Sequence, residues 1–259
     1  MLEDIIKCLL VGYLFGCIST SYLIGKLYNI DIREHGSGNA GTTNTMRVLG
    51  KKAGIMVYLG DCIKCAIAIL IMISVLGKKY ESLPNATDMV QLIKLVTGFG
   101  AVLGHNYPFW LKFKGGKGIA VTSAVIIIFC LPADWYVPII CIIAFTGIFR
   151  TTRYVSLGSL TVITMFLLYV AIAYTGSEVY GKLLFFTFLF TASGFYTHKS
   201  NIKRLMNGTE NKLEKVSDKK MPVNNNINEN NMNNNVNNNM QNNNMNNMYN
   251  NNNNNRPNW

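Results

Sequence analysis

The stretch AGIMVYLGDCIKCAIAILIMISVL, residues 53–76, decides the fold. A helix needs roughly 20 mostly apolar residues to cross a bilayer, so this stretch predicts a transmembrane helix. Its two charged residues, Asp61 and Lys64, are three positions apart and therefore share one helical face. Because a charge in mid-bilayer costs roughly 2.5–3.5 kcal/mol, we expect both to face the bundle interior and to pair. A structural ion pair is the favoured interpretation, and a proton relay is the alternative.

Similar apolar stretches occupy most of the first 198 residues. Together they predict an all-α integral membrane protein with seven transmembrane helices. The count depends most on the fourth and fifth, which are short and separated only by residues 132–138. Because apolar stretches continue along the chain, the first is not expected to be a cleaved signal peptide. The seven predicted spans are residues 5–25, 53–76, 90–109, 118–133, 136–149, 155–175 and 182–197.

The end of the chain differs sharply in composition from the rest. Asparagine supplies 23 of the 32 residues from Asn224 to Asn255, and such a segment buries too little apolar surface to offset its ordering entropy. We therefore divide the chain into a transmembrane domain, residues 1–213, and a disordered Asn-rich tail, residues 214–259. A dispensable extension is the favoured interpretation of the tail, and a docking segment is the alternative.

The formal net charge of +11 is explained by membrane topology. Basic residues gather in alternate connectors between the apolar spans, which is the positive-inside pattern and does not require a nucleic-acid partner. This asymmetry predicts an N-terminus outside and a C-terminus in the cytoplasm. The connectors assigned to the inside hold Lys26, Arg33, Arg47, Lys51, Lys52, Lys112, Lys114, Lys117, Arg150, Arg153, Lys199, Lys203 and Arg204. All three polar motifs described next then fall on the cytoplasmic side.

The first polar motif is GSGNAGTTNTMR, residues 36–47. Small residues allow the backbone to approach a ligand closely, and successive N–H groups in such loops form concave sites for anions. A helix that starts near Gly41 places Thr43, Asn44 and Arg47 on neighbouring turns. Arg47 is then positioned to bind a phosphate through two N–H groups, with Ser37 as a further donor. An ordinary flexible loop is the alternative.

The second motif is HNYPFWLKFKGGKG, residues 105–118. A Gly-Gly-Lys-Gly turn leading into a helix N-terminus is again suited to phosphate. It is not a Walker A loop, because Gly118 follows Lys117 where Ser or Thr is required.

The third motif is HKSNIKRLMNGTE, residues 198–210, directly after the last apolar span. His198 and Asn201 share a helical face, and Glu210 is one of few acidic residues on this side. The alternative is a basic helix attracted to anionic lipid.

Metal and cofactor sites are not expected. Cys62 and Cys65 have CxxC spacing, but no second pair and no nearby histidine completes a zinc site. The acidic residues are too few and scattered to coordinate Mg²⁺.

Together the motifs resemble those of the bacterial acyl-phosphate-dependent glycerol-3-phosphate acyltransferases, the PlsY family. The resemblance covers residues 1 to about 213 and extends to Arg153–Gly158, whereas the tail has no counterpart. Ala40 and Thr42 stand where the family commonly has Pro and Ala, and Cys65 where Gly is usual. The matching residues are Gly36–Asn39, Gly41, Asn44 and Arg47, then His105, Pro108 and Lys114–Gly118, then His198, Asn201, Arg204, Gly208 and Glu210.

The resemblance implies transfer of a fatty acyl group from acyl phosphate to the 1-hydroxyl of glycerol 3-phosphate, in a bacterial cytoplasmic membrane with the site facing the cytoplasm. Membrane lipids are the surrounding partners, and a functional link to an enzyme that makes acyl phosphate is left open. Acyl phosphate is a mixed anhydride with a good leaving group, so a covalent enzyme nucleophile is not required. No histidine is followed by Asp at the fifth position, which disfavours an acyl-CoA enzyme of the HxxxxD type.

Residue roles follow from this resemblance and from the chemistry of phosphate. Arg47, Ser37 and Lys117 are expected to hold phosphate and stabilise developing charge. Asn201 and His198 are expected to orient glycerol 3-phosphate, and Glu210 to act structurally, paired with Arg204 or a loop lysine. The remaining substrate-contacting candidates are Gly38, Asn39, Thr43, Asn44, His105, Lys114, Gly115, Gly116 and Gly118.

Two questions stay open at this point. The hydroxyl proton passes either to the departing phosphate or to a histidine base, His198 or His105. The competing classes of protein are a transporter for a phosphorylated metabolite and a regulatory membrane protein. Internal repeats typical of transporters are not evident in the sequence.

Overall fold

The computed structural model describes residues 1–213, and the predicted disordered tail, residues 214–259, lies outside the described residues. All regular structure within residues 1–213 is helical, which confirms the predicted all-α fold for that part of the chain. The elements, in chain order, are α1 (Leu2–Gly16), α2 (Thr20–Leu27), the short 3-10 helix η1 (Ile32–Glu34), α3 (Thr42–Leu49), α4 (Lys51–Tyr80), α5 (Ala86–Asn106), η2 (Phe109–Leu111), α6 (Ile119–Cys130), α7 (Tyr136–Thr152), α8 (Val155–Ala173), α9 (Tyr180–Thr197) and α10 (Lys199–Met206).

Four helical segments are long and apolar enough to cross a membrane, namely Leu2–Leu27, Lys51–Tyr80, Ala86–Leu111 and Val155–Ala173. Helices α6 and α7 are also apolar but shorter. They are separate helices, as the sequence predicts for the fourth and fifth segments. The count of seven membrane spans stays a prediction.

The first predicted span, residues 5–25, falls within the candidate membrane span Leu2–Leu27, and the helix is interrupted there between α1 and α2 at Cys17–Ser19. A break frees backbone carbonyls, and such groups need partners wherever lipid surrounds the protein. The Trp110 indole donates to the Cys17 carbonyl at 2.8 Å, and the Lys64 ammonium donates to the Ile18 carbonyl at 2.6 Å. Partners distant in sequence therefore stabilise the break, which apolar periodicity alone does not predict.

Helices α1 and α5 pack backbone against backbone through glycine. A Cβ atom on Gly12 would lie 2.1 Å from the Thr97 carbonyl oxygen, and one on Gly104 would lie 2.1 Å from that of Tyr13. Gly16 and Gly100 are equally crowded by the opposite helix. Small residues permit this close approach between membrane helices, where packing and not hydrophobicity drives association. We call these four glycines the α1–α5 seam.

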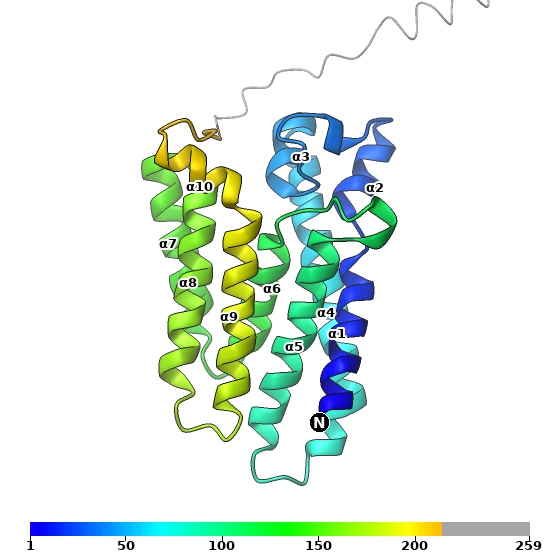
Figure 1. The fold of residues 1–259 in the computed structure, drawn as a ribbon, viewed down its shortest axis with the longest axis vertical. Helices are drawn as coiled ribbons and strands as arrows, with labels where there is room; N and C mark the ends of the chain where they lie inside the picture. Colours follow the sequence, from blue (N-terminus) through cyan, green and yellow to red (C-terminus); the bar gives the residue numbers. More distant parts are fainter. Residues whose placement is uncertain (214–259) are drawn as a thin grey trace, which may run out of the picture. The chain divides into compact units, whose positions relative to one another are not determined.

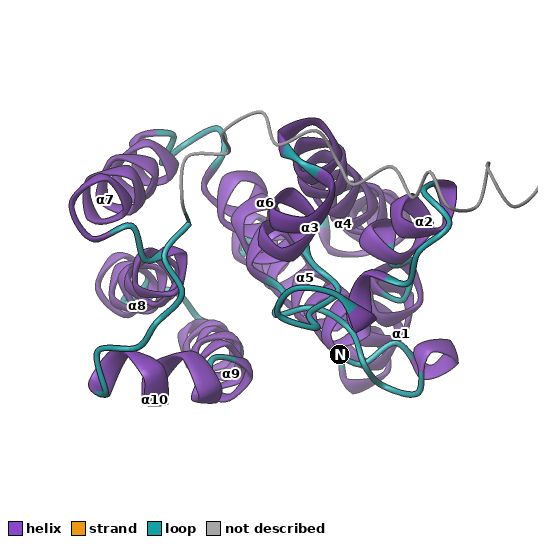
Figure 2. Cartoon of the chain, turned by 90° about the horizontal axis from the view of Figure 1, so that it is seen from above, coloured by secondary structure: helices purple, strands orange, loops and turns teal. Residues whose placement is uncertain are grey.

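Aromatic side chains join the remaining helices. Phe129 of α6 packs edge-on against Phe166 of α8 with ring centroids 5.5 Å apart, and Phe99 of α5 lies 5.3 Å from Phe190 of α9. Offset and edge-on arrangements of this kind stabilise aromatic pairs. Viewed along the helices, α7–α10 gather on one side of this part of the chain and α1–α6 on the other (Figure 2).

The polar motifs share one end of the helical domain. Helices α3 and α10 and the segment between α5 and α6 all lie at the end opposite the N-terminus (Figure 1). Three motifs far apart in the sequence are therefore brought together, as predicted. Which side of the membrane this end faces stays a prediction.

Candidate active site

A cavity of about 430 Å³ opens among the three polar motifs. Its walls combine polar residues from the motifs with apolar residues of the helices below them. The sequence-predicted residues that line it are Ser37, Asn39, Thr43, Asn44, Arg47, His105, Lys117, Gly118, His198, Asn201 and Glu210. Four further candidates, Gly38, Lys114, Gly115 and Gly116, belong to the same loops but are not among the lining residues.

The first loop is folded around Asn44, which is buried at the start of α3. Its amide nitrogen donates to the carbonyls of Ile32 and His35, both at 3.0 Å, and its amide oxygen accepts from the Ser37 N–H at 2.7 Å. Gly36 has a φ of 61°, and a Cβ there would lie 2.3 Å from the Asn44 oxygen. Asn44 thus shapes the loop from within and places Ser37 at the cavity.

Arg47 comes from the last turn of α3 and lines the cavity with an exposed side chain. Within residues 1–213, no carboxylate forms an ion pair with its guanidinium. A guanidinium presents five N–H donors in a planar fork that matches phosphate oxygens. This cation is therefore available to an anionic ligand.

The second loop is fastened to the end of α5. The Gly115 and Gly116 N–H groups donate to the carbonyls of Asn106 and His105 at 3.1 and 3.0 Å. The Ala40 N–H donates to the Gly115 carbonyl at 3.4 Å, which joins the two glycine-rich loops. Helix α6 begins directly after Gly118, as the sequence predicts.

Replacing Gly116 by Ala is expected to lower kcat/KM by about 10- to 100-fold, because the added methyl group forces the loop to shift. Such a shift is expected to cost at least about 1.4 kcal/mol, and each 1.4 kcal/mol corresponds to a factor of about ten in rate. An added Cβ would lie 2.0 Å from His105 Nε2 and 2.8 Å from the Ala40 carbonyl oxygen. Steady-state kinetics of the purified variant measures the effect. Gly147→Ala is the matched control, because nothing lies within 4 Å of a Cβ at that position. Equal rates for the two variants would contradict this role of the loop.

Lys117 connects the second loop to the third motif. Its ammonium donates to the Asn201 side-chain oxygen, and the Asn201 amide donates to Glu210 Oε1 at 2.6 Å. Burial lowers the pKa of Lys117 to about 8, since desolvation disfavours the charged form and the Glu210 carboxylate offsets only part of this effect. Lys117 is therefore a cation that loses its proton close to physiological pH.

The Glu210 carboxylate accepts hydrogen bonds from three side chains. Besides Asn201, its carboxylate accepts from Ser156 Oγ at 2.9 Å and from Arg204 Nε at 2.8 Å. Burial would raise the pKa of Glu210, but these donors outweigh it and hold that pKa below its ordinary value. The predicted pairing of Glu210 with Arg204 is confirmed.

Ser156 is a residue whose role the sequence did not reveal. It lies in the Arg153–Gly158 stretch, whose resemblance to a known family was the available signal. A serine in an apolar helix carries no further mark of function.

Replacing Glu210 by Ala is expected to lower the free energy of unfolding by about 2–4 kcal/mol, because three donors lose a buried acceptor. The stabilisation depends on the ionised carboxylate and is lost as pH falls through its lowered pKa. Thermal unfolding of detergent-purified protein measures the change. Glu178→Ala is the control, because that carboxylate is exposed and, within residues 1–213, accepts a hydrogen bond only from Asn85. An unchanged midpoint for Glu210→Ala would contradict the structural role.

His198 follows α9 and is buried at the cavity wall. Its Nδ1 lies 2.8 Å from the Gly194 carbonyl, which only accepts, so Nδ1 carries a proton and Nε2 is the acceptor in the neutral ring. Burial first and nearby Lys117 second lower the pKa of His198 to about 4. The imidazole is therefore neutral at physiological pH and is a weak base.

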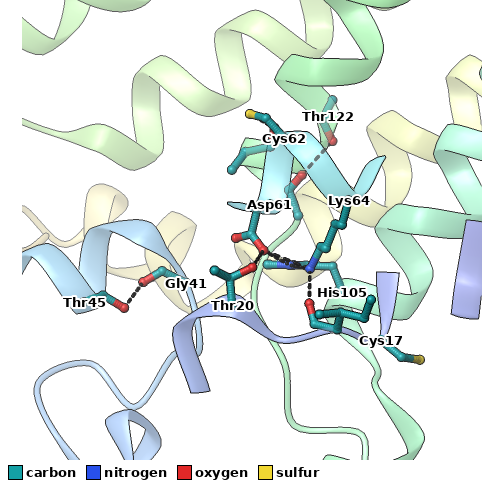
Figure 3. Close-up of polar contacts among 12 residues, drawn as sticks. Cys17, Thr20, Gly41, Thr45, Asp61, Cys62, Lys64, His105 and Thr122 are labelled. Atoms are coloured by element: carbon teal, nitrogen blue, oxygen red, sulfur yellow. Dashed lines mark hydrogen bonds and ion pairs between the residues drawn. The ribbon is translucent and has the colours of Figure 1, made fainter. Parts of the chain in front are cut away.

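The predicted ion pair between Asp61 and Lys64 is confirmed, with Lys64 Nζ 2.8 Å from Asp61 Oδ1 and both side chains buried. Figure 3 shows His105 from α5 beside this pair, together with Thr20 from α2. Asp61 and His105 also line the cavity. The pair thus reaches the cavity through Asp61, whereas Lys64 is not among the lining residues.

Apolar and aromatic side chains also line the cavity. They include Phe145 and Phe149 of α7 and Ile55 and Tyr58 of α4. The Tyr58 hydroxyl lies 2.9 Å from Ser123 Oγ of α6, which links α4 to α6. None of these residues was predicted for the site, because aliphatic and aromatic residues are typical of any membrane helix. The cavity as a whole is lined by cations, by hydrogen-bond donors and by apolar side chains.

Comparison with known proteins adds independent information. The family model described as glycerol-3-phosphate acyltransferase matches residues 6–208. The glycerol-3-phosphate acyltransferase of Thermoanaerobacter sp. (strain X514) is 38% identical over 205 residues, which cover 79% of this chain and 93% of the relative. That of Clostridioides difficile (strain 630) is 38% identical over 208 residues, covering 78% and 92%.

Two solved structures are also similar to this chain. One is the crystal structure of PlsY (YgiH), described as an integral membrane glycerol 3-phosphate acyltransferase, in its glycerol 3-phosphate form. It has a TM-score of 0.67 and 34% sequence identity, covering 81% of this chain and 96% of that one. The lysophosphatidic acid form of the same protein has a TM-score of 0.66.

Proposed function

The chain belongs to the glycerol-3-phosphate acyltransferase family of integral membrane proteins, and we propose that it takes its acyl group from acyl phosphate. The acyl carbon forms an ester bond with the 1-hydroxyl of glycerol 3-phosphate, and its bond to the phosphate oxygen breaks. The products are lysophosphatidic acid and inorganic phosphate, in a step of phospholipid biosynthesis.

The observation that carries this proposal is the mixed lining of the cavity. The cations Arg47, Lys117 and Arg204 line it and suit two phosphate groups. Apolar side chains of α4 and α7 also line it and suit a fatty acyl chain. A donor with a phosphate head and an acyl tail matches both kinds of lining residue.

Each polar residue then has a role that its position supports. Arg47, Ser37 and Lys117 bind the donor phosphate and stabilise charge at the tetrahedral centre. Asn201 and His198 orient glycerol 3-phosphate, and His198 Nε2 accepts a hydrogen bond from it. Because a base with a pKa of about 4 is weaker than a phosphate dianion, the hydroxyl proton goes to the departing phosphate.

We propose the predicted topology for this domain. Residues 1–213 form the acyltransferase domain, with seven spans in a bacterial cytoplasmic membrane and the cavity facing the cytoplasm. The basic residues at the cavity end support this orientation. Cysteines introduced at Lys199 and at Lys182 test it, since only the former is expected to react with an impermeant thiol reagent added from the cytoplasmic side of inverted vesicles. Native cysteines would first be replaced.

The decisive assay supplies purified protein with acyl phosphate and glycerol 3-phosphate. We expect equal amounts of lysophosphatidic acid and phosphate to appear. Acyl-CoA and acyl carrier protein thioesters are tested as alternative donors in parallel. Product from either thioester, with none from acyl phosphate, would overturn the donor assignment and leave the acyltransferase family intact.

A further inference from the structure

The buried ammonium of Lys64 has three N–H groups and three acceptors. Its Nζ lies 2.6 Å from the Ile18 carbonyl oxygen, 2.8 Å from Asp61 Oδ1 and 3.1 Å from His105 Nδ1. Figure 3 shows Asp61 and His105 beside Nζ of Lys64. An ammonium donates and never accepts, so the third N–H of Lys64 donates to the lone pair on His105 Nδ1.

This arrangement determines where His105 carries its proton. The Lys64 ammonium lies 3.1 Å from Nδ1 and can only donate, so Nδ1 accepts this hydrogen bond and carries no proton. The Nδ1 atom also lies 3.4 Å from Asp61 Oδ1, but a proton on Nδ1 would face the hydrogens of Lys64 at the shorter distance. In the neutral ring the remaining proton therefore lies on Nε2.

The Nε2 edge of the ring faces the second glycine loop. A Cβ atom on Gly116 would lie 2.0 Å from Nε2 and 2.8 Å from the Ala40 carbonyl oxygen, so the imidazole edge meets the junction of both loops. His105 lines the cavity beside these loops. We propose that Lys64 is a positioning residue which holds His105 as the Nε2–H tautomer, so that His105 donates a hydrogen bond to bound acyl phosphate and does not act as a base.

This role rests on the proposed function, but the tautomer itself does not. The two cavity histidines then have opposite polarity. His198 is protonated on Nδ1 and presents an acceptor, whereas His105 presents a donor. A hydroxyl substrate suits the first, and a phosphate oxygen suits the second. The assignment also removes His105 from the two histidines considered as the base.

Nitrogen NMR of protein labelled in the histidine rings reads the tautomer directly. The chain has only three histidines, so assignment needs two substitutions, at His35 and His198. We expect the His105 signals to be those of a protonated Nε2 and an unprotonated Nδ1. In Lys64→Met, the Asp61 carboxylate becomes the nearest polar neighbour of Nδ1. We then expect the signals of a protonated Nδ1 and an unprotonated Nε2. Lys94→Met, which removes another helix lysine, is expected to leave it unchanged. A protonated Nδ1 in the unaltered protein would overturn the proposal.

Kinetics of His105 variants test the donor role separately. A glutamine amide reproduces a donor near Nε2, whereas an asparagine amide reaches only the position of Nδ1. We expect His105→Gln to keep kcat/KM within about threefold and His105→Asn to lose about 10- to 100-fold, the loss typical of a hydrogen bond to a charged group. Equal losses in both variants would overturn the donor role. The NMR result does not depend on the acyl donor, so a failure of the proposed reaction is distinguishable from a wrong tautomer.

Discussion

Arg47→Ala is expected to lower kcat/KM for acyl phosphate by about 100- to 1,000-fold, which is the loss typical of removing a donor aimed at developing charge. The guanidinium lines the cavity and has no carboxylate ion-pair partner in residues 1–213, so its loss leaves no unpaired protein charge behind. The effect should therefore appear in catalysis and not in folding. Kinetics and thermal unfolding of the same preparation separate the two.

Two companion variants sharpen this test. Arg47→Lys keeps the charge but lacks the planar pair of N–H groups, so we expect an intermediate rate. Lys52→Ala removes an exposed cation from the first turn of α4 that is not among the cavity residues, and we expect it to be close to wild type. Wild-type kcat/KM in Arg47→Ala would contradict the phosphate-binding role.

Lys117→Met is expected to lower kcat/KM about 1,000-fold, because the ammonium that donates to Asn201 is also the one proposed to bind the donor phosphate. The unaltered enzyme should show the consequence of its lowered pKa. Lys117 is charged below about pH 8 and loses its charge above, so kcat/KM should fall about tenfold per pH unit beyond that point. His198 is neutral throughout this range and adds no limb near neutral pH.

The pH profile of Lys117→Arg supplies the check, because arginine stays charged. Whatever its absolute rate, this variant should lose the alkaline limb seen near pH 8. Lys112→Met, an exposed lysine of the same loop, should keep the wild-type profile. An alkaline limb that persists unchanged in Lys117→Arg would assign that limb to another group.

Features carried by local patterns could be predicted from the sequence. Charge spacing indicated the Asp61–Lys64 pair, and the glycine turn before Ile119 indicated the start of α6. The motif after the last span contained both partners of the Arg204–Glu210 bond. In each case the residues concerned are close in sequence, so the local geometry of one helix or one turn is enough to bring them together.

Features that depend on tertiary contacts could not be predicted. The break at Cys17–Ser19 needs Lys64 and Trp110, which come from other helices. The same is true of Ser156, because its hydroxyl can donate to Glu210 only when the segment after α10 folds back onto α8. The spacing of residues along the sequence carries no information about such tertiary contacts. The proposed tautomer of His105 could not be predicted either, since it depends on Lys64 from the neighbouring helix α4.

The α1–α5 seam links distant parts of the molecule to the chemistry. His105 and the loop anchored on it extend from the end of α5, and the carbonyl that Lys64 binds lies just beyond α1. A single methyl group on Gly12 or Gly100 would separate the two helices although neither residue lines the cavity. A search for heat-sensitive alleles should therefore return glycines of this seam as readily as residues that touch substrate. The positions of the reacting groups therefore depend on a contact in which the backbones of α1 and α5 meet with no side chains between them.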